Sequence, residues 1–584
     1  MPDALAATQS LARKNLSINT SIDETIVPVT GLTLRAQQSV DAFDYRYSGY
    51  QYPRPNEITP MGDVNDWYGS NTGSNNQSFQ RYYSFTYTNT AEYTTTIADV
   101  HNLTVLLGQE SIITKNELFG AYGSGYTDSR LMFLGDAVSP VTKDDLTQSI
   151  SRTVFNSFFG TASYDYNNRY FIDLTYRRDG SSKFAAGHRW SNFYSVGAMW
   201  RISNEQFMSS VKWVDDLALR LSYGTTGNAG ISPWLYAGTL GGGNPYTGGL
   251  TGNDGQSIGI ASSRNKDLTW ETVKAWDLGL TFSVLNNKIK GEIDFYRKET
   301  TDMLMRIPYS YTTGFSGGWG NIGNMTNTGV DIDLNFAIFT TKDWYWGIRA
   351  NFNYNRNEIT KLFDGQDTFT LPNTLTQYRV GHSAGEFYTV EFAGVDPRDG
   401  QQMWVDCNGN LTKQFNEERD SKLITKSMFA PYSGGFGTDV RWRDFSLRVD
   451  FNWAADKYLT NNDRYFVENN NFGDQNNQMV SMLDVWTYPG QVTDIPAVGQ
   501  ELQFDSHLIE NASYLRMKNL TFTYKLPQSA LNKLHLENLS FHFTGRNLLT
   551  FTGYSGYDPE PETNIVAFFY HNTRQYEIGF EVGF

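Results

Sequence analysis

The sequence has almost no cysteine, little proline and no long apolar run. Cys407 is its single thiol, which excludes an intrachain disulfide and a multi-thiol metal site. It nowhere approaches about 18 consecutive apolar residues, so no membrane-spanning helix is expected. Basic residues are in the minority, and the net charge of −15 argues against a nucleic-acid partner. Residues 1–20 lack a basic segment followed by an apolar one, so no signal peptide is predicted in this chain.

Aromatic residues are abundant instead, with 36 Tyr, 38 Phe and 14 Trp, while the mean hydropathy is only −0.47. A membrane β-barrel combines these two properties, because each strand turns apolar residues toward lipid and polar residues toward the lumen. The composition therefore permits a membrane protein without apolar helices.

Strict alternation of apolar and polar residues is the dominant pattern. In residues 445–453, every odd position is apolar and every even one polar, including Arg448 and Asp450. Alternate residues of a strand face opposite sides, and an Arg at the membrane midplane costs about 2–4 kcal/mol, so these charges are expected in a wet lumen. The pattern recurs in segments of roughly ten residues, the length of a tilted membrane strand. Further examples are 172–177, 217–223, 289–295, 330–336, 348–354 and 539–544. The sequence predicts an all-β fold, an antiparallel transmembrane β-barrel with roughly sixteen strands.

The connections between these strands differ in length. Asn286-Asn287 predicts a tight hairpin, since Asn tolerates positive φ. Long connections are expected at about 46–78, 114–146, 225–264, 360–430 and 457–505. Short turns at one end and long loops at the other are typical of outer-membrane barrels. A soluble β-sandwich would rarely need connections this long.

The chain ends inside an alternating strand. Its apolar positions are Tyr576, Ile578, Phe580, Val582 and the terminal Phe584. This ending resembles the C-terminal signal that the barrel-assembly machinery recognises, and we predict that role for these five residues.

Several separated blocks resemble one family. They include RRDGSSKF (177–184), WRISNEQF (200–207), LRLSYGTTGN (219–228), NKDLTWETVKAWDLGLTF (265–282), NIGNMTNTGVDID (321–333), AGVDPRDG (393–400), YLRMKNLTFTYKLP (514–527) and GRNLLTFTGYSGYDPE (545–560). In content and order they are similar to the SusC/RagA family of TonB-dependent outer-membrane transporters from Bacteroidota. Residues 1–584 would then form the C-terminal part of the barrel domain, without the plug domain or TonB box.

The resemblance implies a set of partners. Such a transporter lies in the cell outer membrane, is covered by a SusD-like lipoprotein, and takes up oligosaccharides or peptides. TonB would supply energy only through a plug that this chain lacks. Barrels of the plugged type have about 22 strands, so the first several strands are expected to be missing here. Two alternatives stay open: a passive porin of about sixteen strands, and a surface barrel without transport activity.

Enzymatic and metal sites have little support, and no cofactor is predicted. The G-x-S-x-G match at 314–318 lies in a loop of an all-β pattern and not in the strand-to-helix turn that this motif needs. The stretch from Asp406 echoes a Ca²⁺ loop, but Leu411 stands where the sharp turn requires Gly, so a polar turn is favoured.

Aromatic residues in the long loops are the candidate substrate contacts. They are Tyr50, Tyr52, Trp67, Tyr68, Trp234 and Tyr236. Aromatic faces beside polar groups suit sugar rings or peptides. Packing between loops, or a place in the interfacial aromatic girdle, is the alternative role.

Overall fold

The computed structural model describes residues 9–52, 72–139, 142, 145–242, 258–260, 262–315, 317–371, 374–469, 477–563, 565–566 and 571–584. Trp67 and Tyr68 lie outside the described residues.

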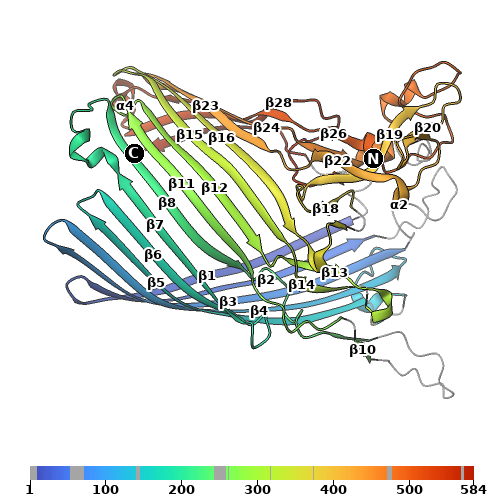
Figure 1. Ribbon diagram of the computed structural model, residues 1–584, viewed down its shortest axis with the longest axis horizontal. Helices are drawn as coiled ribbons and strands as arrows, with labels where there is room; N and C mark the ends of the chain where they lie inside the picture. The colour runs from blue at the N-terminus through green and yellow to red at the C-terminus, as the bar shows by residue number, and fades with distance from the viewer. Residues whose placement is uncertain are drawn as a thin grey trace.

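One large antiparallel sheet dominates the molecule (Figure 1). Its seventeen described strands follow one another in chain order, and each pairs with its neighbours in the sequence of strands. They are β1 (Gln9–Val29), β2 (Leu32–Gln51), β3 (Gly73–Ile97), β4 (His101–Tyr126), β5 (Leu146–Tyr166), β6 (Tyr170–Ser181), β7 (Trp190–Arg201), β8 (Val214–Asn228), β11 (Glu271–Val284), β12 (Ile289–Thr301), β15 (Asn324–Thr340), β16 (Trp344–Lys361), β23 (Tyr432–Trp442), β24 (Phe445–Ala455), β27 (Tyr514–Lys525), β28 (Asn538–Thr552) and β30 (Gln575–Gly583). This is the antiparallel barrel wall that the alternation predicts.

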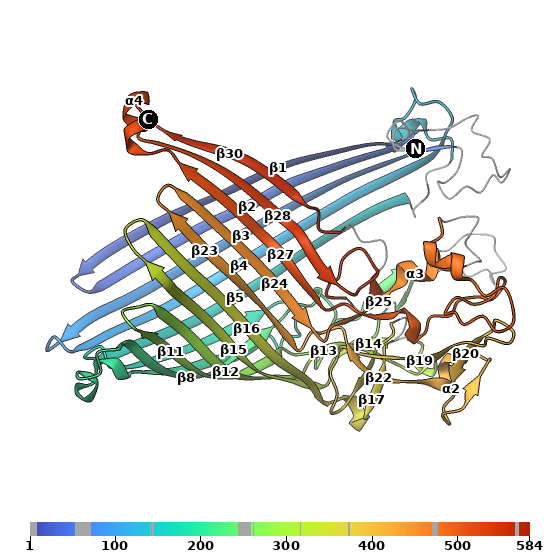
Figure 2. The same ribbon diagram turned by 90° about the horizontal axis from the view of Figure 1, so that it is seen from above.

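The wall has two open borders. Within the described residues, β1 pairs only with β2, and β30 pairs only with β28. Figure 2 shows the strands curving round from one border to the other. Backbone groups left unpaired in lipid cost several kcal/mol each, roughly, so both borders need a covering partner in a membrane.

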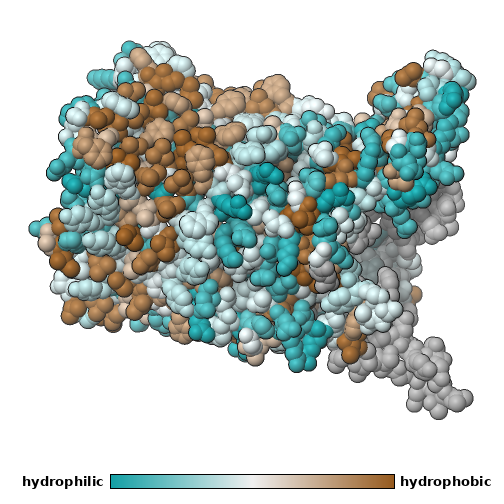
Figure 3. Space-filling view, in the orientation of Figure 1, coloured by the Kyte–Doolittle hydropathy of each residue, from teal (hydrophilic) through white to brown (hydrophobic). Residues whose placement is uncertain are grey.

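The two faces of the sheet have opposite character. Ile172, Leu174 and Tyr176 of β6 lie exposed on one face, as do Leu221 of β8 and Leu278 of β11. Figure 3 shows apolar side chains gathered over the strands at the end that carries the short turns. We call this the outer face. Charged side chains of the same strands lie on the other, lumenal face.

Two ion pairs on the lumenal face have the same arrangement, in which a glycine lies on the strand between the two partners. Gly279 of β11 lies directly opposite Arg220 of β8 and Asp294 of β12. Because Gly279 has no side chain, Arg220 reaches across the strand to Asp294, at 2.8 Å. Gly437 of β23 plays the same part between Arg349 of β16 and Asp450 of β24, which lie 2.7 Å apart.

The connections alternate between the two ends of the wall. At one end the strands are joined by short turns, where Asn167, Asn168, Asn286 and Asn287 all adopt positive φ, as predicted for the Asn pair at 286–287. A short helix, α4 (Gln528–Leu534), belongs to this end, and Phe584 also lies there (Figure 1). The other end carries the long connections, and we call it the loop end. In outer-membrane barrels the long loops are extracellular.

The loop end has secondary structure of its own. Its strands are β9 (Leu240–Gly242), β10 (Ile258–Ile260), β13 (Leu304–Pro308), β14 (Gly317–Asn321), β17 (Thr368–Thr370), β18 (Gln377–Arg379), β19 (Glu386–Val395), β20 (Gln402–Val405), β21 (Leu411–Thr412), β22 (Ser421–Ser427), β25 (Tyr458–Asn461), β26 (Ile509–Asn511) and β29 (Ile565–Val566), with helices α2 (Glu417–Asp420) and α3 (Asn462–Val467). The buried apolar clusters lie mainly here. One joins Leu375, Phe387 and Ile509, and another joins Leu459, Ala512, Tyr554 and Val566. The loops therefore form packed structure.

The strand lengths correct the expectation of roughly ten residues. β3 has 25 residues and β4 has 26, so β2, β3 and β4 extend well into the connections expected at 46–78 and 114–146. Alternation of this kind continues beyond the membrane, where the lipid no longer limits strand length.

Among the helices of the described residues, none has the length and apolarity needed to cross a membrane.

A glycine substitution tests the shared design of the ion pairs. An added Cβ at Gly279 would lie 2.8 Å from the Arg220 guanidinium and nearer still to Asp294. Gly279→Ala should therefore separate the pair and lower the free energy of unfolding by about 1 kcal/mol, allowing for solvent screening in the lumen. Urea unfolding of the protein in detergent micelles would measure this loss.

The matched control is Gly197→Ala on the lumenal face of β7, where the nearest atom to the added Cβ is 3.8 Å away. Equal stability of the two variants would contradict the role assigned to Gly279.

Candidate functional site

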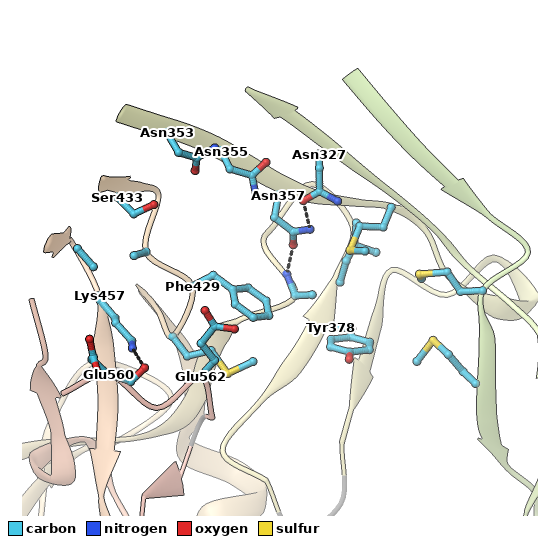
Figure 4. A pocket seen from close by; sticks show the side chains of 18 of the residues that line it. Asn327, Asn353, Asn355, Asn357, Tyr378, Phe429, Ser433, Lys457, Glu560 and Glu562 are labelled. Atoms are coloured by element: carbon cyan, nitrogen blue, oxygen red, sulfur yellow. Dashed lines mark hydrogen bonds between the residues drawn. The ribbon is translucent and has the colours of Figure 1, made fainter. Parts of the chain in front are cut away.

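A cavity of about 640 Å³ opens at the loop end of the lumen (Figure 4). The wall strands β11, β15, β16, β23, β24 and β27 form one part of its lining, and the long connections form the rest. Its lining residues include Glu271, Met303, Met305, Met325, Asn327, Asn353, Asn355, Asn357, Tyr378, Met428, Phe429, Ser433, Lys457, Tyr514, Glu560 and Glu562. Amide, thioether, aromatic and charged groups therefore meet in one space.

A row of asparagines forms the strand side of the cavity. Asn353, Asn355 and Asn357 occupy alternate positions of β16 and so project to the same, lumenal face. Asn327 of β15 accepts hydrogen bonds from the amides of Asn355 and Asn357, at 3.3 and 3.0 Å. The Asn357 carbonyl oxygen accepts from the backbone N–H of Ala384, at 2.8 Å. Each side-chain amide both donates and accepts, so the row can bind a solute that carries both kinds of group.

A buried lysine belongs to the part of the cavity wall that the long connections form. Lys457 is 4% exposed and donates three hydrogen bonds, to the carbonyl oxygens of Pro559, Glu560 and Pro561, at 2.9, 2.8 and 2.9 Å. Burial lowers the pKa of its ammonium group, and nearby Glu562 opposes that shift. Lys457 thereby fastens the connection 553–574, which brings Glu560 and Glu562 to the cavity.

A second buried cation fastens the same connection. Arg516 of β27 is 4% exposed and donates to Asp558, at 2.8 Å, and to Glu560, at 2.6 Å. Burial alone would raise the pKa of Asp558. Hydrogen bonds from the Asn572 backbone and from Arg516 outweigh burial, and the pKa of Asp558 is lowered. The position of the connection therefore depends on ionised Asp558.

The aromatic residues expected to contact substrate are not brought together. Tyr50 is the second-last residue of β2, opposite Ser10 and Asn75, and Tyr52 follows that strand. Trp234 is 51% exposed in the connection between β8 and β11. Tyr236 packs against a buried cluster that includes Phe184 and Trp270. Among the described residues of this set, none lines the cavity at the loop end.

The residues predicted as an assembly signal all lie on β30 or at its end. Tyr576, Ile578, Phe580 and Phe584 are exposed, and Val582 is half-buried. They stand on the open border of the wall.

The asparagine row was missed in the sequence, although a signal for it exists. Residues 351–357 read NFNYNRN, with Asn at every second position. That spacing places four amides on one face of a strand. Lys457 and Glu560 reach the cavity through a contact between residues about a hundred positions apart in the sequence, and no local sequence pattern indicates such a contact.

In the described part of the chain, no three His, Cys, Asp or Glu side chains are grouped so that they could hold a metal ion. The Asp406 carboxylate accepts hydrogen bonds from the backbone N–H groups of Asn408 and Asn410, at 2.9 and 2.8 Å, and so shapes the turn before β21.

Comparison with known proteins identifies the family. Residues 10–548 match the TonB-dependent receptor-like β-barrel family, and the chain belongs to it. TonB-dependent receptor P3 of Formosa agariphila is 29% identical over 519 residues, which are 83% of this chain and 51% of that protein. TonB-dependent receptor SusC of Bacteroides thetaiotaomicron is 29% identical over 456 residues, 75% of this chain and 44% of that protein. The chain spans about half the length of these curated relatives.

Solved structures narrow the assignment to the SusC/RagA type. The RagAB peptide transporter is 36% identical, with a TM-score of 0.88 over 100% of this chain and 63% of that one. In its open-open state, the RagAB peptide importer gives a TM-score of 0.90. The chain is therefore an outer-membrane barrel protein of a family of receptors and transporters rather than enzymes.

Removing the buried ammonium group should release the connection 553–574. Lys457→Met leaves three carbonyl oxygens without their donor, which should weaken the anchoring of that connection by about 1.5–3 kcal/mol. Limited thermolysin digestion, followed by mass spectrometry of the fragments, should show faster cleavage within 553–563. Lys342→Met, in an exposed turn, is the control and should leave cleavage unchanged. Identical digestion of both variants would refute the anchoring role.

Acid should release the same connection. Because the folded-state pKa of Asp558 is lowered, its stabilisation is present above the ordinary value of 3.8 and is lost as the pH falls through the lowered value. A spin label on Tyr557→Cys, in a Cys407→Ser background, should be more mobile in acid than at neutral pH. The added change Asp558→Asn should give a mobile label at both pH values. An acid transition that survives this change would assign it to another group.

Proposed function

We propose that this chain forms the wall and the solute-binding loops of a SusC-type TonB-dependent importer, which takes up oligosaccharides or peptides. The observation that carries the proposal is the cavity of amide and charged groups at the loop end of a wall that matches the RagAB peptide transporter along its whole length. A solute held there would stand at the outer mouth of the lumen.

Uptake would begin at the loop end and finish in the periplasm. A SusD-like lipoprotein would cover the loops, and energy from TonB would act through a plug carried outside residues 1–584. Further strands, also outside these residues, would join β1 to β30. The chain spans 44% of SusC and 63% of the RagAB chain. These shares support the placement of the plug and the further strands outside residues 1–584.

Peptides and oligosaccharides share the chemistry that the asparagine row fits. Main-chain amides and sugar hydroxyls both offer donors and acceptors, which side-chain amides satisfy. The name of the RagAB peptide transporter favours peptides. Contact of solutes with Tyr50, Tyr52, Trp67, Tyr68, Trp234 and Tyr236 stays a prediction.

Uptake by cells that express the whole protein tests the proposal. Asn353→Ala and Asn355→Ala each remove one amide from the cavity, and each should reduce uptake roughly fivefold, the effect of one hydrogen bond of about 1 kcal/mol. The measurement is accumulation of labelled oligopeptides and, separately, of labelled oligosaccharides. Asn351→Ala lies on the same face of β16 outside the cavity lining and should leave uptake unchanged.

Collapse of the proton gradient separates the importer from a passive porin. Uptake through a TonB-dependent importer should stop, whereas diffusion through a porin would continue. Failure to accumulate either class of solute would instead favour a surface barrel without transport activity.

A further inference from the structure

Aromatic rings gather on one face of β2 and β3, in the half of these strands nearer the loops. Phe43, Tyr45 and Tyr47 occupy alternate positions of β2, and Tyr82 of β3 pairs directly with Phe43. Alternate residues of a strand, and residues paired across two neighbouring strands, share one face of a sheet. We call these four residues the aromatic strip.

The register places the aromatic strip on the lumenal face. Arg177 of β6 is lumenal, because its neighbour Tyr176 lies on the outer face, and it forms an ion pair with Glu110 of β4, at 2.8 Å. Asn116 stands six positions after Glu110 on the same strand, so it also faces the lumen. Asn116 pairs directly with Tyr82, and the strip therefore lies on the same side of the wall.

The aromatic strip lies on the loop side of the part of the wall that crosses the membrane. Counted from Leu32, which follows the turn between β1 and β2, Phe43 is the twelfth residue of β2 and Tyr47 the sixteenth. About 9–11 residues of a tilted strand cross the hydrocarbon layer. A solute that enters at the loop end therefore meets the strip before it reaches the level of the membrane core.

The surroundings of the strip are polar but uncharged. Asn15 of β1 and Gln80 of β3 pair with Tyr45 on its two sides, and Gln80 donates a hydrogen bond to Asn116, at 2.9 Å. Among the described residues of β1 to β5, the two lumenal rows that contain Tyr45 and Phe43 carry no charged side chain. Side-chain amides thus flank the rings, and each amide can both donate and accept hydrogen bonds.

Two contacts hold the rings along the wall. The rings of Phe43 and Tyr82 are stacked, with centroids 5.0 Å apart and an angle of 19° between their planes. Tyr47 lies over Gly49, where an added Cβ would be 2.6 Å from the Tyr47 hydroxyl oxygen. The four aromatic side chains are half-buried, so part of each is open to the lumen. Apolar surface that faces water gains free energy when a solute covers it.

We propose that the aromatic strip binds a neutral oligosaccharide in the outer part of the lumen, an inference that rests on the proposed function. One face of a sugar ring carries apolar C–H groups, which can pack on an aromatic ring, while its hydroxyl groups can bond to Asn15 and Gln80. A stretch without charge suits a solute without charge, because no ion loses its water on binding. The site is separate from the cavity, whose lining comes from residue 271 onward.

Calorimetric titration of the whole purified protein in detergent tests the site. The probes are neutral hexasaccharides of glucose, of mannose and of xylose, and at least one should bind. Tyr45→Ala should weaken that binding roughly tenfold, because it removes a ring that packs on the sugar. Tyr45→Phe keeps the ring and should weaken it much less.

Tyr87→Ala is the matched control. Tyr87 belongs to β3 but pairs with Gln38 and lies 40% exposed on the outer face, so its loss should leave sugar binding unchanged. Equal binding by Tyr45→Ala and Tyr87→Ala, or no binding of any of the three hexasaccharides, would overturn the proposal. Continued uptake of labelled oligopeptides in that case would leave the importer itself intact.

Chemical labelling shows whether the strip is open to solutes. Tyr45→Cys, in a Cys407→Ser background, should react with a water-soluble maleimide, and the hexasaccharide that binds should slow this reaction. A thiol that does not react would mean that another part of the whole protein covers the strip, and the proposal would then be wrong.

Discussion

The need to pair every backbone amide within the membrane governs this structure. Lipid offers no hydrogen-bond partner, so each strand must have a neighbour on both sides. The seventeen described strands meet this need by pairing in chain order, and β1 and β30 are the places where it is not met within the chain. Alternation follows from the same constraint, because a wall one strand thick has lipid on one face and water on the other.

On the lumenal face, charged side chains are accommodated by the space that glycines leave as well as by ion pairing. Gly279 and Gly437 each leave room for an arginine to cross one strand and reach an aspartate on the next. Three neighbouring strands are thereby joined by side chains in addition to the backbone ladder.

Much of the wall could be predicted because its signals are local. Arg448 and Asp450 show the lumenal face of β24, and the asparagines at 286–287 mark a turn that has positive φ in the structure. Strand length could not be predicted, since β3 and β4 continue beyond the lipid that would limit them. The close contacts of Gly180 and Gly227 could not be predicted either. They lie within strands, where an added Cβ would meet the rings of Trp190 and Phe193, and an aromatic ring over a glycine leaves no local sequence pattern. The cavity was missed for a related reason, because its wall joins β16 to residues about a hundred or more positions away.

The pairing of strands in chain order has a consequence for how the protein folds. Each contact within the wall joins consecutive strands, so the sheet can grow one hairpin at a time with little loop-closure entropy to overcome at each step. The hydrogen bonds from Lys457 to Pro559, Glu560 and Pro561 join residues that are far apart in the sequence, and they require β24 and β28 to be in place. The loop end is therefore the slow part of the folding reaction, and its cavity takes shape only after the wall that supports it.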